Sequence, residues 1–221
     1  MLQTSSTNDD LLKVLNSLMK VPSLGPFRLV GGTALSLQLG HRISEDIDLF
    51  ASVEYGSIDF KKILIDLTSL FPYLRNDDAI FGLENMENNT GLHLHIGNTE
   101  EASIKTDILN WTISQWLDPE KEVEGIRFAT IEEIALMKLE VVARGGRKKD
   151  FWDLSEIFEN ISLASLLERY PQKFPFLPIE NVKKGLIDFS VADQMPDPIC
   201  LKGKFWDTVK ADMQMYLEKA S

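Results

Sequence analysis

The chain has little cysteine and no long apolar run. Cys200 is the single cysteine among 221 residues, so no internal disulfide can form, and with no histidine fixed beside it the thiol is interpreted as structural. No uncharged apolar stretch approaches the ~18 residues that span a bilayer, and no basic leader precedes an apolar segment at the N-terminus. These absences predict a cytoplasmic protein without membrane contact.

Basic residues are in deficit. The chain holds 23 Lys and Arg against 34 Asp and Glu, a net charge of -11 at pH 7. This balance argues against a broad, nonspecific nucleic-acid surface, because attraction to phosphate scales with clustered cationic side chains. Residues 143–150, ARGGRKKD, are a local exception. They indicate either a polyanion contact or a solvated junction between helices.

Hydrophobic periodicity divides the chain into a mixed α/β first half and a helical second half. In the first half we expect helices over 8–20, 33–40 and 58–71, strands at 27–30, 47–50 and 103–111, and a hairpin from Ile80 to Gly97. In the second half we expect helices over 130–144, 148–160, 162–170, 179–189 and 203–219. We place the boundary near residue 125. This gives an α/β core over 1–125 and a helical lobe over 126–221, and without a Gly-, Ser- or Pro-rich linker the two should pack closely.

The stretch GGTALSLQLGHRISEDIDLF, residues 31–50, combines a glycine turn with two acids. On a strand, Asp46 and Asp48 project from one face while Ile47 and Leu49 point into the core. Two adjacent carboxylates repel each other, so they persist if solvent or a cation neutralises them. Mg²⁺ takes such oxygen ligands and binds substrate phosphates at the same time. Asp107, on the same strand face as Lys105, could supply a third ligand.

The turn before the acids fits an anion. Gly31 and Gly32 allow the backbone to approach a phosphate closely. The following helix start would direct its free N–H groups, and the hydroxyl of a capping Thr33, at that anion. A tight turn followed by solvent-facing acids is the alternative. We favour a joint metal and phosphate site because the turn and the acid pair occur together.

Lys138 is the most informative residue of the helical half. It lies in the middle of an apolar helical arc made by Ile131, Ile134, Ala135, Val141 and Val142. An ammonium buried there without a counter-charge would be costly. Lys138 therefore either extends along the apolar surface to water or reaches into a cleft to meet an acid or a phosphate. The acids of the first half favour the second interpretation.

Further acids and two histidines complete the candidates. Asp150 and Asp153 share one side of the next helix, where they either serve an active site or complement the positive helix start. Both alternatives stay open for Asp153. His93 and His95 alternate onto one strand face, but without a third nitrogen or sulfur ligand nearby they are assigned no role.

With these motifs in place, the chain resembles the AbiEii/AbiGii-type nucleotidyltransferases, a branch of the DNA polymerase β-like superfamily that includes toxins of bacterial toxin–antitoxin systems. Residues 31–50 resemble the first motif, a glycine–hydroxyl turn followed by D-x-D, and KTD, residues 105–107, resembles the second. Residues 132–154 resemble the third and fourth motifs combined. The resemblance implies an α/β (α+β) fold, with a small mixed sheet flanked by helices and followed by a helical lobe.

The resemblance also implies an activity: an NMP is transferred from an NTP to an acceptor, and pyrophosphate is released. Asp46 and Asp48 would hold Mg²⁺ or Mn²⁺, and Asp107 would complete the metal shell and help deprotonate the acceptor. The remaining roles fall to Asp150 as a required acid, and to Gly31, Gly32, Thr33, Lys138 and Arg147 as nucleotide contacts, with Arg42 as a weaker candidate.

The acceptor is expected to be RNA, such as tRNA, and a cognate antitoxin is expected as partner. The alternatives are a small-molecule acceptor, for instance an aminoglycoside, whose positive charge would suit an acidic cleft, and a nucleotide-binding regulator that has lost turnover.

Overall fold

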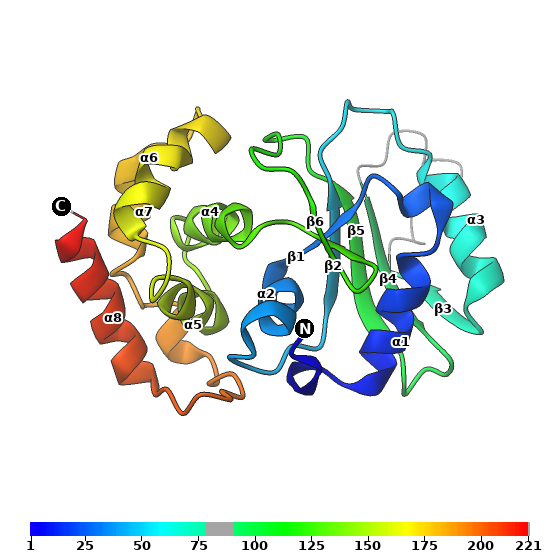
Figure 1. Cartoon of the computed structure of the whole chain (residues 1–221), viewed down its shortest axis with the longest axis horizontal. Helices are drawn as coiled ribbons and strands as arrows, with labels where there is room; N and C mark the ends of the chain where they lie inside the picture. Colours follow the sequence, from blue (N-terminus) through cyan, green and yellow to red (C-terminus); the bar gives the residue numbers. More distant parts are fainter. Residues whose placement is uncertain (78–90, 221) are drawn as a thin grey trace.

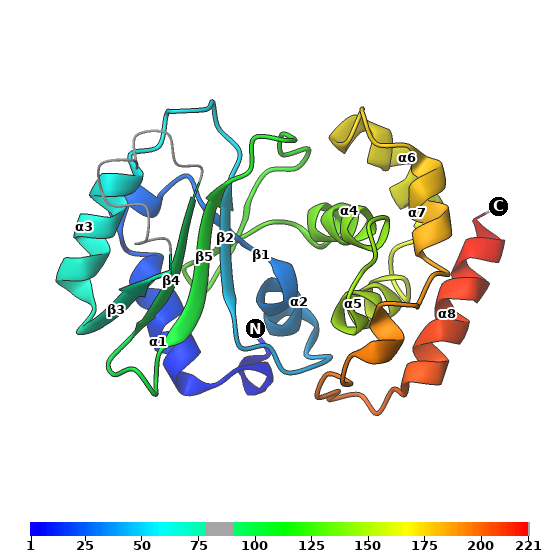
Figure 2. The same cartoon turned by 180° about the vertical axis from the view of Figure 1, so that it is seen from behind.

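A seven-stranded mixed sheet forms the centre of the molecule, in the order β3-β4-β5-β2-β1-β7-β6 (Figures 1 and 2). The computed structural model describes residues 1–77 and 91–220. The strands are β1 Arg28–Val30, β2 Ile47–Ala51, β3 Tyr73–Asn76, β4 Gly91–Gly97, β5 Ile104–Asn110, β6 Lys121–Val123 and β7 Ile126–Phe128. The mixed α/β class expected from the sequence is therefore confirmed.

Strand β2 lies in the interior of this sheet, antiparallel to β1 and parallel to β5. Its side chains alternate as the sequence predicts: Ile47, Leu49 and Ala51 are fully buried, whereas Asp48 and Phe50 on the other face are partly exposed. The register places Asp48 directly opposite Asp107 of β5. Two acids that are 59 positions apart in the sequence are thus neighbours in the sheet.

Helices cover both faces of the sheet. Helices α1 (Asp9–Leu18) and α3 (Phe60–Leu70) lie on one face, and α2 (Gly31–Leu39) lies on the other, between the sheet and the helical lobe (Figures 1 and 2). The lobe comprises α4 Ile131–Val142, α5 Lys148–Ile157, α6 Leu163–Lys173, α7 Ile179–Gly185 and α8 Trp206–Lys219. Short 3-10 turns occupy Thr4–Ser6, Pro22–Leu24 and Ala192–Gln194. Among these helices, none is long and apolar enough to cross a membrane.

Polar side chains define where several of these helices begin. Asn8 accepts a hydrogen bond from the backbone N–H of Leu11, and Thr130 accepts one from the N–H of Glu133. Each such bond satisfies one of the N–H groups that a helix start leaves without an internal partner. The expected helix ranges are therefore close to the observed ones, with ends that are shorter by one to four residues at most positions.

The strands are the part of the fold that periodicity predicts least well. The three short strands β3, β6 and β7 were not expected, because three or four residues display little alternation. The equally short β1 was expected from the run FRLVGG. Of the expected hairpin, residues 91–97 form β4, and residues 80–90 lie outside the described part of the chain. Strand β7 pairs with β1, so the sheet continues to Phe128, beyond residue 125. The domain division itself stays a prediction.

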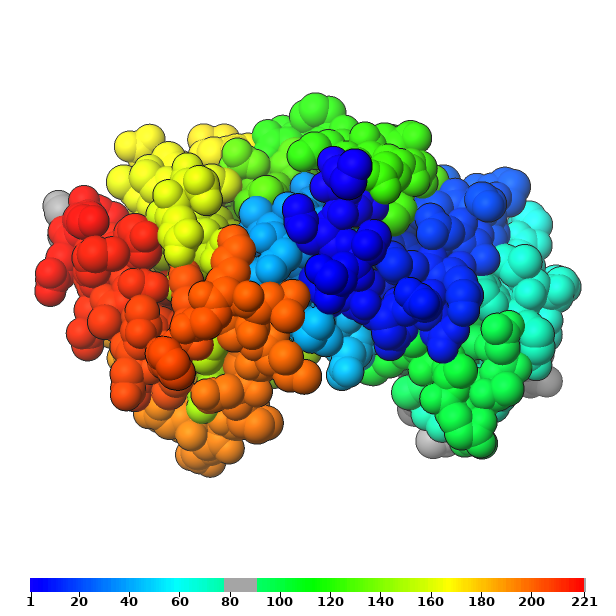
Figure 3. Space-filling model, turned by 60° about the horizontal axis from the view of Figure 1, so that its bottom comes forward, coloured from blue at the N-terminus to red at the C-terminus, as the bar shows by residue number. Residues whose placement is uncertain are grey.

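The segment between α2 and β2 is held from two sides. Arg42 forms an isolated β-bridge with Cys200, and the N–H of Ile43 donates to Ile199 O at 2.9 Å. The N–H of Ser44 donates to Ser6 O, also at 2.9 Å. In Figure 3 the dark blue N-terminal segment and the orange segment near residue 200 appear on the same face of the molecule. This double attachment fixes the loop that leads into Asp46.

Candidate active site

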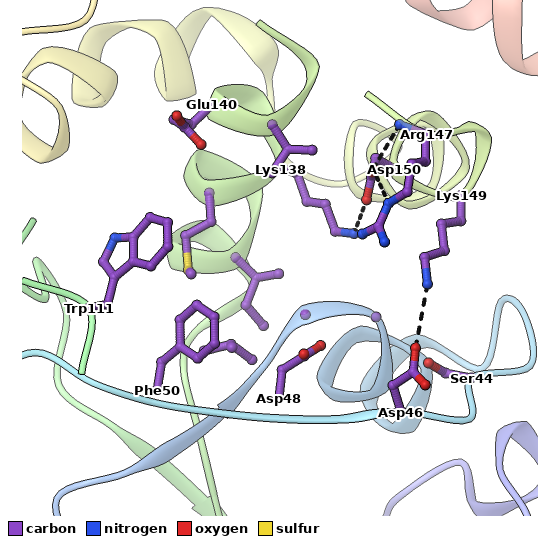
Figure 4. A pocket seen from close by; sticks show the side chains of 16 residues that line it. Ser44, Asp46, Asp48, Phe50, Trp111, Lys138, Glu140, Arg147, Lys149 and Asp150 are labelled. Atoms are coloured by element: carbon purple, nitrogen blue, oxygen red, sulfur yellow. Dashed lines mark hydrogen bonds and ion pairs between the residues drawn. The ribbon is translucent and has the colours of Figure 1, made fainter. Parts of the chain in front are cut away.

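A cleft of about 180 Å³ lies between the sheet, the start of α2 and helices α4 and α5 (Figure 4). Many of the residues that the sequence indicates meet here, although they come from separate elements. The lining residues are Val30, Gly31, Gly32, Ser44, Asp46, Asp48, Phe50, Trp111, Ile134, Met137, Lys138, Glu140, Val141, Arg147, Lys149 and Asp150. Of the predicted site residues, Thr33 and Asp107 do not line the cleft.

Asp46, just before β2, and Asp48, on β2, differ in environment. The Asp46 side chain is 41% exposed, and its Oδ2 lies 3.6 Å from Lys149 Nζ. Burial, together with the charges of Asp107 and Asp46, raises the pKa of Asp48 to about 6. A divalent cation next to Asp48 would favour its ionised form and reverse that shift. The donor set therefore fits a hard cation chemically.

Asp107 is already engaged by two side chains. Lys105 Nζ donates to its Oδ2 at 2.5 Å, and His93 Nδ1 lies 2.9 Å from its Oδ1. Burial works to raise the pKa of Asp107, but the hydrogen bonds from Lys105 and His93 outweigh it and lower that pKa. The expected shared face of Lys105 and Asp107 is confirmed, whereas His93, to which we assigned no role, contacts a candidate catalytic acid.

The three carboxylates do not yet form a metal site. Within residues 1–77 and 91–220, no group of three or more His, Cys, Asp or Glu side chains is arranged to hold a metal ion. Asp107 does not line the cleft, and its two oxygens contact Lys105 and His93. Metal binding by Asp46, Asp48 and Asp107 stays a prediction, and it requires Asp107 to release one of these contacts.

Gly31 is required by its backbone and by its neighbour. Its φ of +70° is a conformation that L side chains rarely adopt, and a Cβ built there would lie 2.3 Å from Asp48 Oδ2. At Gly32 a Cβ would lie 2.3 Å from Arg42 Nη2. The turn therefore lets the backbone approach the acid and the arginine closely. Its contact with a nucleotide stays a prediction.

The prediction that Thr33 caps helix α2 is wrong. The helix begins at Gly31, and Val30 occupies the capping position, so Thr33 lies inside the first turn and is fully buried. Its hydroxyl donates to Asp46 O and lies 2.8 Å from Ser44 Oγ. The glycines allow the helix to start earlier than a capping hydroxyl would suggest. Thr33 thus fastens the backbone of Asp46 and does not face the cleft.

Lys138 reaches an acid pair, as one of its two interpretations predicted. Its Nζ lies 2.5 Å from Asp150 Oδ1 and 2.8 Å from Asp153 Oδ2, and its side chain is 8% exposed. Burial works to lower the pKa of Lys138, but the charges of Asp153 and Asp150 raise it overall. Lys138 is therefore a permanent cation at the cleft wall.

Asp153 is fully buried and connects three elements. Arg42 Nε and Nη2 donate to its two oxygens at 2.6 and 2.9 Å, and His41 Nε2 lies 2.8 Å from Oδ1. Burial opposes ionisation, but the charges of Arg42 and Lys138 hold the pKa of Asp153 well below its usual range. Arg42 is 3% exposed and does not line the cleft. It binds Asp153, whereas we had considered it a weaker candidate for contacting the nucleotide.

Asp150 anchors a second cation at the start of α5. Its Oδ2 accepts from the backbone N–H of Arg147 at 2.9 Å and from Arg147 Nε at 3.3 Å. Arg147 and Lys149 both line the cleft, and their side chains are 54% and 36% exposed. Figure 4 shows both on the side of the cleft opposite the aromatic residues. Together with Lys138 they give this end of the cleft three positive side chains.

Sequence reasoning missed the other end of the cleft. Phe50 and Trp111 stack with ring centroids 5.4 Å apart and an interplanar angle of 16°. Phe50 could have been found, because it continues the alternating face of Asp46 and Asp48 by one more step along β2. Trp111, Met137 and Glu140 carry no local signal of this role, since they line one cleft although Trp111 follows β5 and the other two lie on α4.

Replacing Gly31 by alanine should disable this site. Gly56 is a matched control because its φ is also positive, +81°, yet a Cβ there meets nothing within 4 Å. Both variants carry backbone strain of roughly 1–2 kcal/mol, but only Gly31→Ala also forces the Asp48 carboxylate to move. We expect Gly31→Ala to lower the free energy of unfolding by roughly 3 kcal/mol and to abolish nucleotide binding. Urea denaturation and calorimetry measure the two effects. If Gly31→Ala and Gly56→Ala had the same free energy of unfolding and the same nucleotide affinity, the predicted clash between a side chain at position 31 and Asp48 would be contradicted.

The fold of this chain is similar to those of two solved structures. The structure of MenT4, the nucleotidyltransferase toxin Rv2826c from Mycobacterium tuberculosis H37Rv, is similar with a TM-score of 0.58 at 15% identity, over 94% of this chain and 82% of MenT4. JHP933 from Helicobacter pylori is similar with a TM-score of 0.54 at 17% identity, over 95% of this chain and 90% of JHP933. At these identities the likeness establishes the fold.

The family follows from the sequence match. The family model for the nucleotidyl transferase AbiEii toxin of type IV toxin–antitoxin systems matches residues 13–197, and the chain belongs to this family. An uncharacterized protein, aq_aa25, from Aquifex aeolicus (strain VF5) is 29% identical over 216 residues, which cover 91% of this chain and 95% of that protein. The resemblance drawn from the sequence motifs is confirmed.

Proposed function

We propose that this nucleotidyltransferase transfers an NMP from an NTP to RNA in a Mg²⁺-dependent reaction. The observation that carries the proposal is the division of charge within one cleft. Asp46 and Asp48 line one wall, while Lys138, Arg147 and Lys149 line the other. A triphosphate bound with a divalent cation needs both kinds of partner at once.

Each group has a separate task in this proposal. Asp46 and Asp48 would hold Mg²⁺ or Mn²⁺, joined by Asp107, and the ion would supply charge neutralisation at the reacting phosphate. Arg147 and Lys149, the more exposed cations, would bind the triphosphate oxygens. Lys138 is fixed by Asp150 and Asp153, so it would provide a preorganised positive charge.

The bond changes follow from this arrangement. The hydroxyl oxygen of the acceptor forms a new bond to the α-phosphorus, and the bond from that phosphorus to the oxygen bridging to the β-phosphate breaks. Pyrophosphate leaves with that bridging oxygen, held by the cationic wall. The hydroxyl proton passes to solvent, because Asp107, which we expected to accept it, would be a metal ligand in this arrangement and has a lowered pKa.

The proposed acceptor is RNA, such as tRNA, in the cytoplasm, and the proposed partner is a cognate antitoxin. The AbiEii family description as a toxin of type IV toxin–antitoxin systems supports the second point. The basic stretch 143–150 supports the first, because it borders the cleft through Arg147 and Lys149, and the Arg144 side chain beside them is 64% exposed. A polyanion could therefore approach the cleft despite the acidic net charge.

The test is transfer of label from α-³²P-labelled NTPs to total bacterial RNA in the presence of Mg²⁺. We expect label in RNA with the intact protein, none after chelation by EDTA, and recovery when Mg²⁺ or Mn²⁺ is added back. Turnover that survives EDTA would overturn the metal requirement.

The two alternative functions give different results in the same assay. A small-molecule nucleotidyltransferase would leave RNA unlabelled but release pyrophosphate when cationic acceptors such as aminoglycosides are added. A regulator without turnover would bind NTP with Mg²⁺ and release no pyrophosphate with any acceptor. Either outcome would overturn the RNA assignment.

A further inference from the structure

The cleft is polar at one end and aromatic at the other. Asp46, just before β2, and Asp48 and Phe50, on β2, all line the cleft at alternate positions of the chain, so a nucleotide with phosphates beside the acids would extend toward Phe50. Trp111 stacks on Phe50 (Figure 4), and Met137 also lines the cleft. Flat aromatic faces of this kind accept any nucleobase by stacking.

One charged group lies at this aromatic end. Glu140 lines the cleft and is 5% exposed, so its carboxylate is removed from bulk water. Its Oε1 pairs with Arg144, whose side chain is 64% exposed. Within the described residues, Oε2 of Glu140 is not among the fully buried oxygens that lack a partner, so this oxygen is open to the cleft. A ligand in the cleft that brings an N–H group to this open oxygen would form a charge-assisted hydrogen bond with it.

The four nucleobases differ in what they can offer. Adenine, cytosine and guanine each carry an exocyclic amino group, which can donate to a carboxylate. Uracil has a single N–H flanked by two carbonyl oxygens, and those oxygens would face the negative charge of Glu140. A carboxylate placed to accept from an exocyclic amino group therefore disfavours uracil, which has no such group and presents a carbonyl oxygen on each side of its N–H.

We propose that Phe50 and Trp111 stack the nucleobase of the substrate and that Glu140 selects bases with an exocyclic amino group over uracil. This inference rests on the proposed function, because it requires an NTP in the cleft. It assigns to Glu140 a role in specificity that is separate from the metal and phosphate contacts of the polar end. The Arg144 guanidinium would hold the Glu140 carboxylate in place from the solvent side.

The test is direct binding of the α,β-methylene analogues of ATP, CTP, GTP and UTP, measured by calorimetry with Mg²⁺. We expect the UTP analogue to bind at least 10-fold more weakly than the tightest of the other three. Glu140→Gln keeps the shape but provides an amide that can donate to uracil, so the ratio should fall below about 3-fold. Glu132→Gln, on the same helix but away from the cleft, should leave the ratio unchanged.

Trp111→Ala separates stacking from base selection. It should weaken all four analogues by a similar factor, about 10-fold, and leave the UTP ratio as it is. Equal affinity of the intact protein for all four analogues, or an unchanged ratio in Glu140→Gln, would overturn this inference alone. If no analogue binds to the intact protein, the proposed function fails together with it.

Discussion

Replacing Asp48 by asparagine is expected to lower the rate of nucleotidyl transfer on the order of 10³-fold, because the site loses several kcal/mol of charge stabilisation at the reacting phosphate. Asparagine has the same shape, so the fold is retained. The measurement is the initial rate of label transfer from α-³²P NTP. Asp10→Asn, a change at an exposed acid paired with Lys13 on α1, is the control and should keep full activity.

The Asp48→Asn variant should also be more stable than the natural chain at neutral pH. Burial, Asp107 and Asp46 raise the pKa of Asp48 from 3.8 to about 6, so the folded state binds the proton more tightly than the unfolded state does. Its contribution to the free energy of unfolding therefore decreases as the pH rises from 4 to 6. Asparagine removes that loss, which is about 3 kcal/mol for a shift of this size. An activity loss without a gain in stability would contradict the like-charge repulsion assigned to Asp48.

The pH dependence gives an internal check on this prediction. Because Asp150 and Asp153 have lowered pKa values, their contributions to stability rise with pH and mask that of Asp48 in the natural chain. The difference in Tm between Asp48→Asn and the natural chain isolates the Asp48 contribution. We expect this difference to be larger at pH 7 than at pH 4.5. Mg²⁺ should raise the Tm of the natural chain and have little effect on the variant.

Replacing Asp153 by alanine is expected to cause a large loss of stability, roughly 3–5 kcal/mol. The substitution leaves Arg42 and Lys138 buried without the carboxylate that both bind. Urea denaturation of the purified variant measures the effect. Asp207→Ala is the matched control, because Asp207 is also a helical acid paired with a lysine, but its side chain is 95% exposed. That change should cost less than about 1 kcal/mol.

Asp150 provides the comparison that separates a structural acid from a site acid. Asp150 lines the cleft, whereas Asp153 lies behind it. We expect Asp150→Asn to lower the rate of nucleotidyl transfer and to change the free energy of unfolding little. The asparagine oxygen can still accept the hydrogen bonds from Arg147, but the negative charge that pairs with Lys138 is lost. If Asp153→Ala were as stable as the natural chain, the buried network would not hold the helical lobe to the loop before β2.

Much of the site was predictable because it depends on local geometry. A strand alternates its side chains with a period of two, so the shared face of Asp46 and Asp48 follows from their spacing alone. Lys138 was recognisable because a cation in an apolar helical arc needs a partner. The sequence also contained enough of the motif order around these residues to indicate the family, which the match over residues 13–197 confirmed.

Other features depend on which elements pack together, and no local pattern encodes them. Asp153 meets Arg42 across 111 positions of the chain, and Asp107 meets His93 only because β4 and β5 pair in that register. Both alternatives for Asp153 stayed open until its partners were known. Thr33 has the chemistry of a helix cap, yet the helix begins two residues earlier, at Gly31.

The sequence by itself therefore determined the helices, the acid face of β2, the glycine turn and the family, because periodicity, backbone freedom and motif order act over short distances. The tertiary structure decided which charge meets which and what faces the cleft. Ion pairing and burial are properties of neighbours in space, and here those neighbours are brought together by the register of β2 with β5 and by the packing of α4 and α5 against the start of α2.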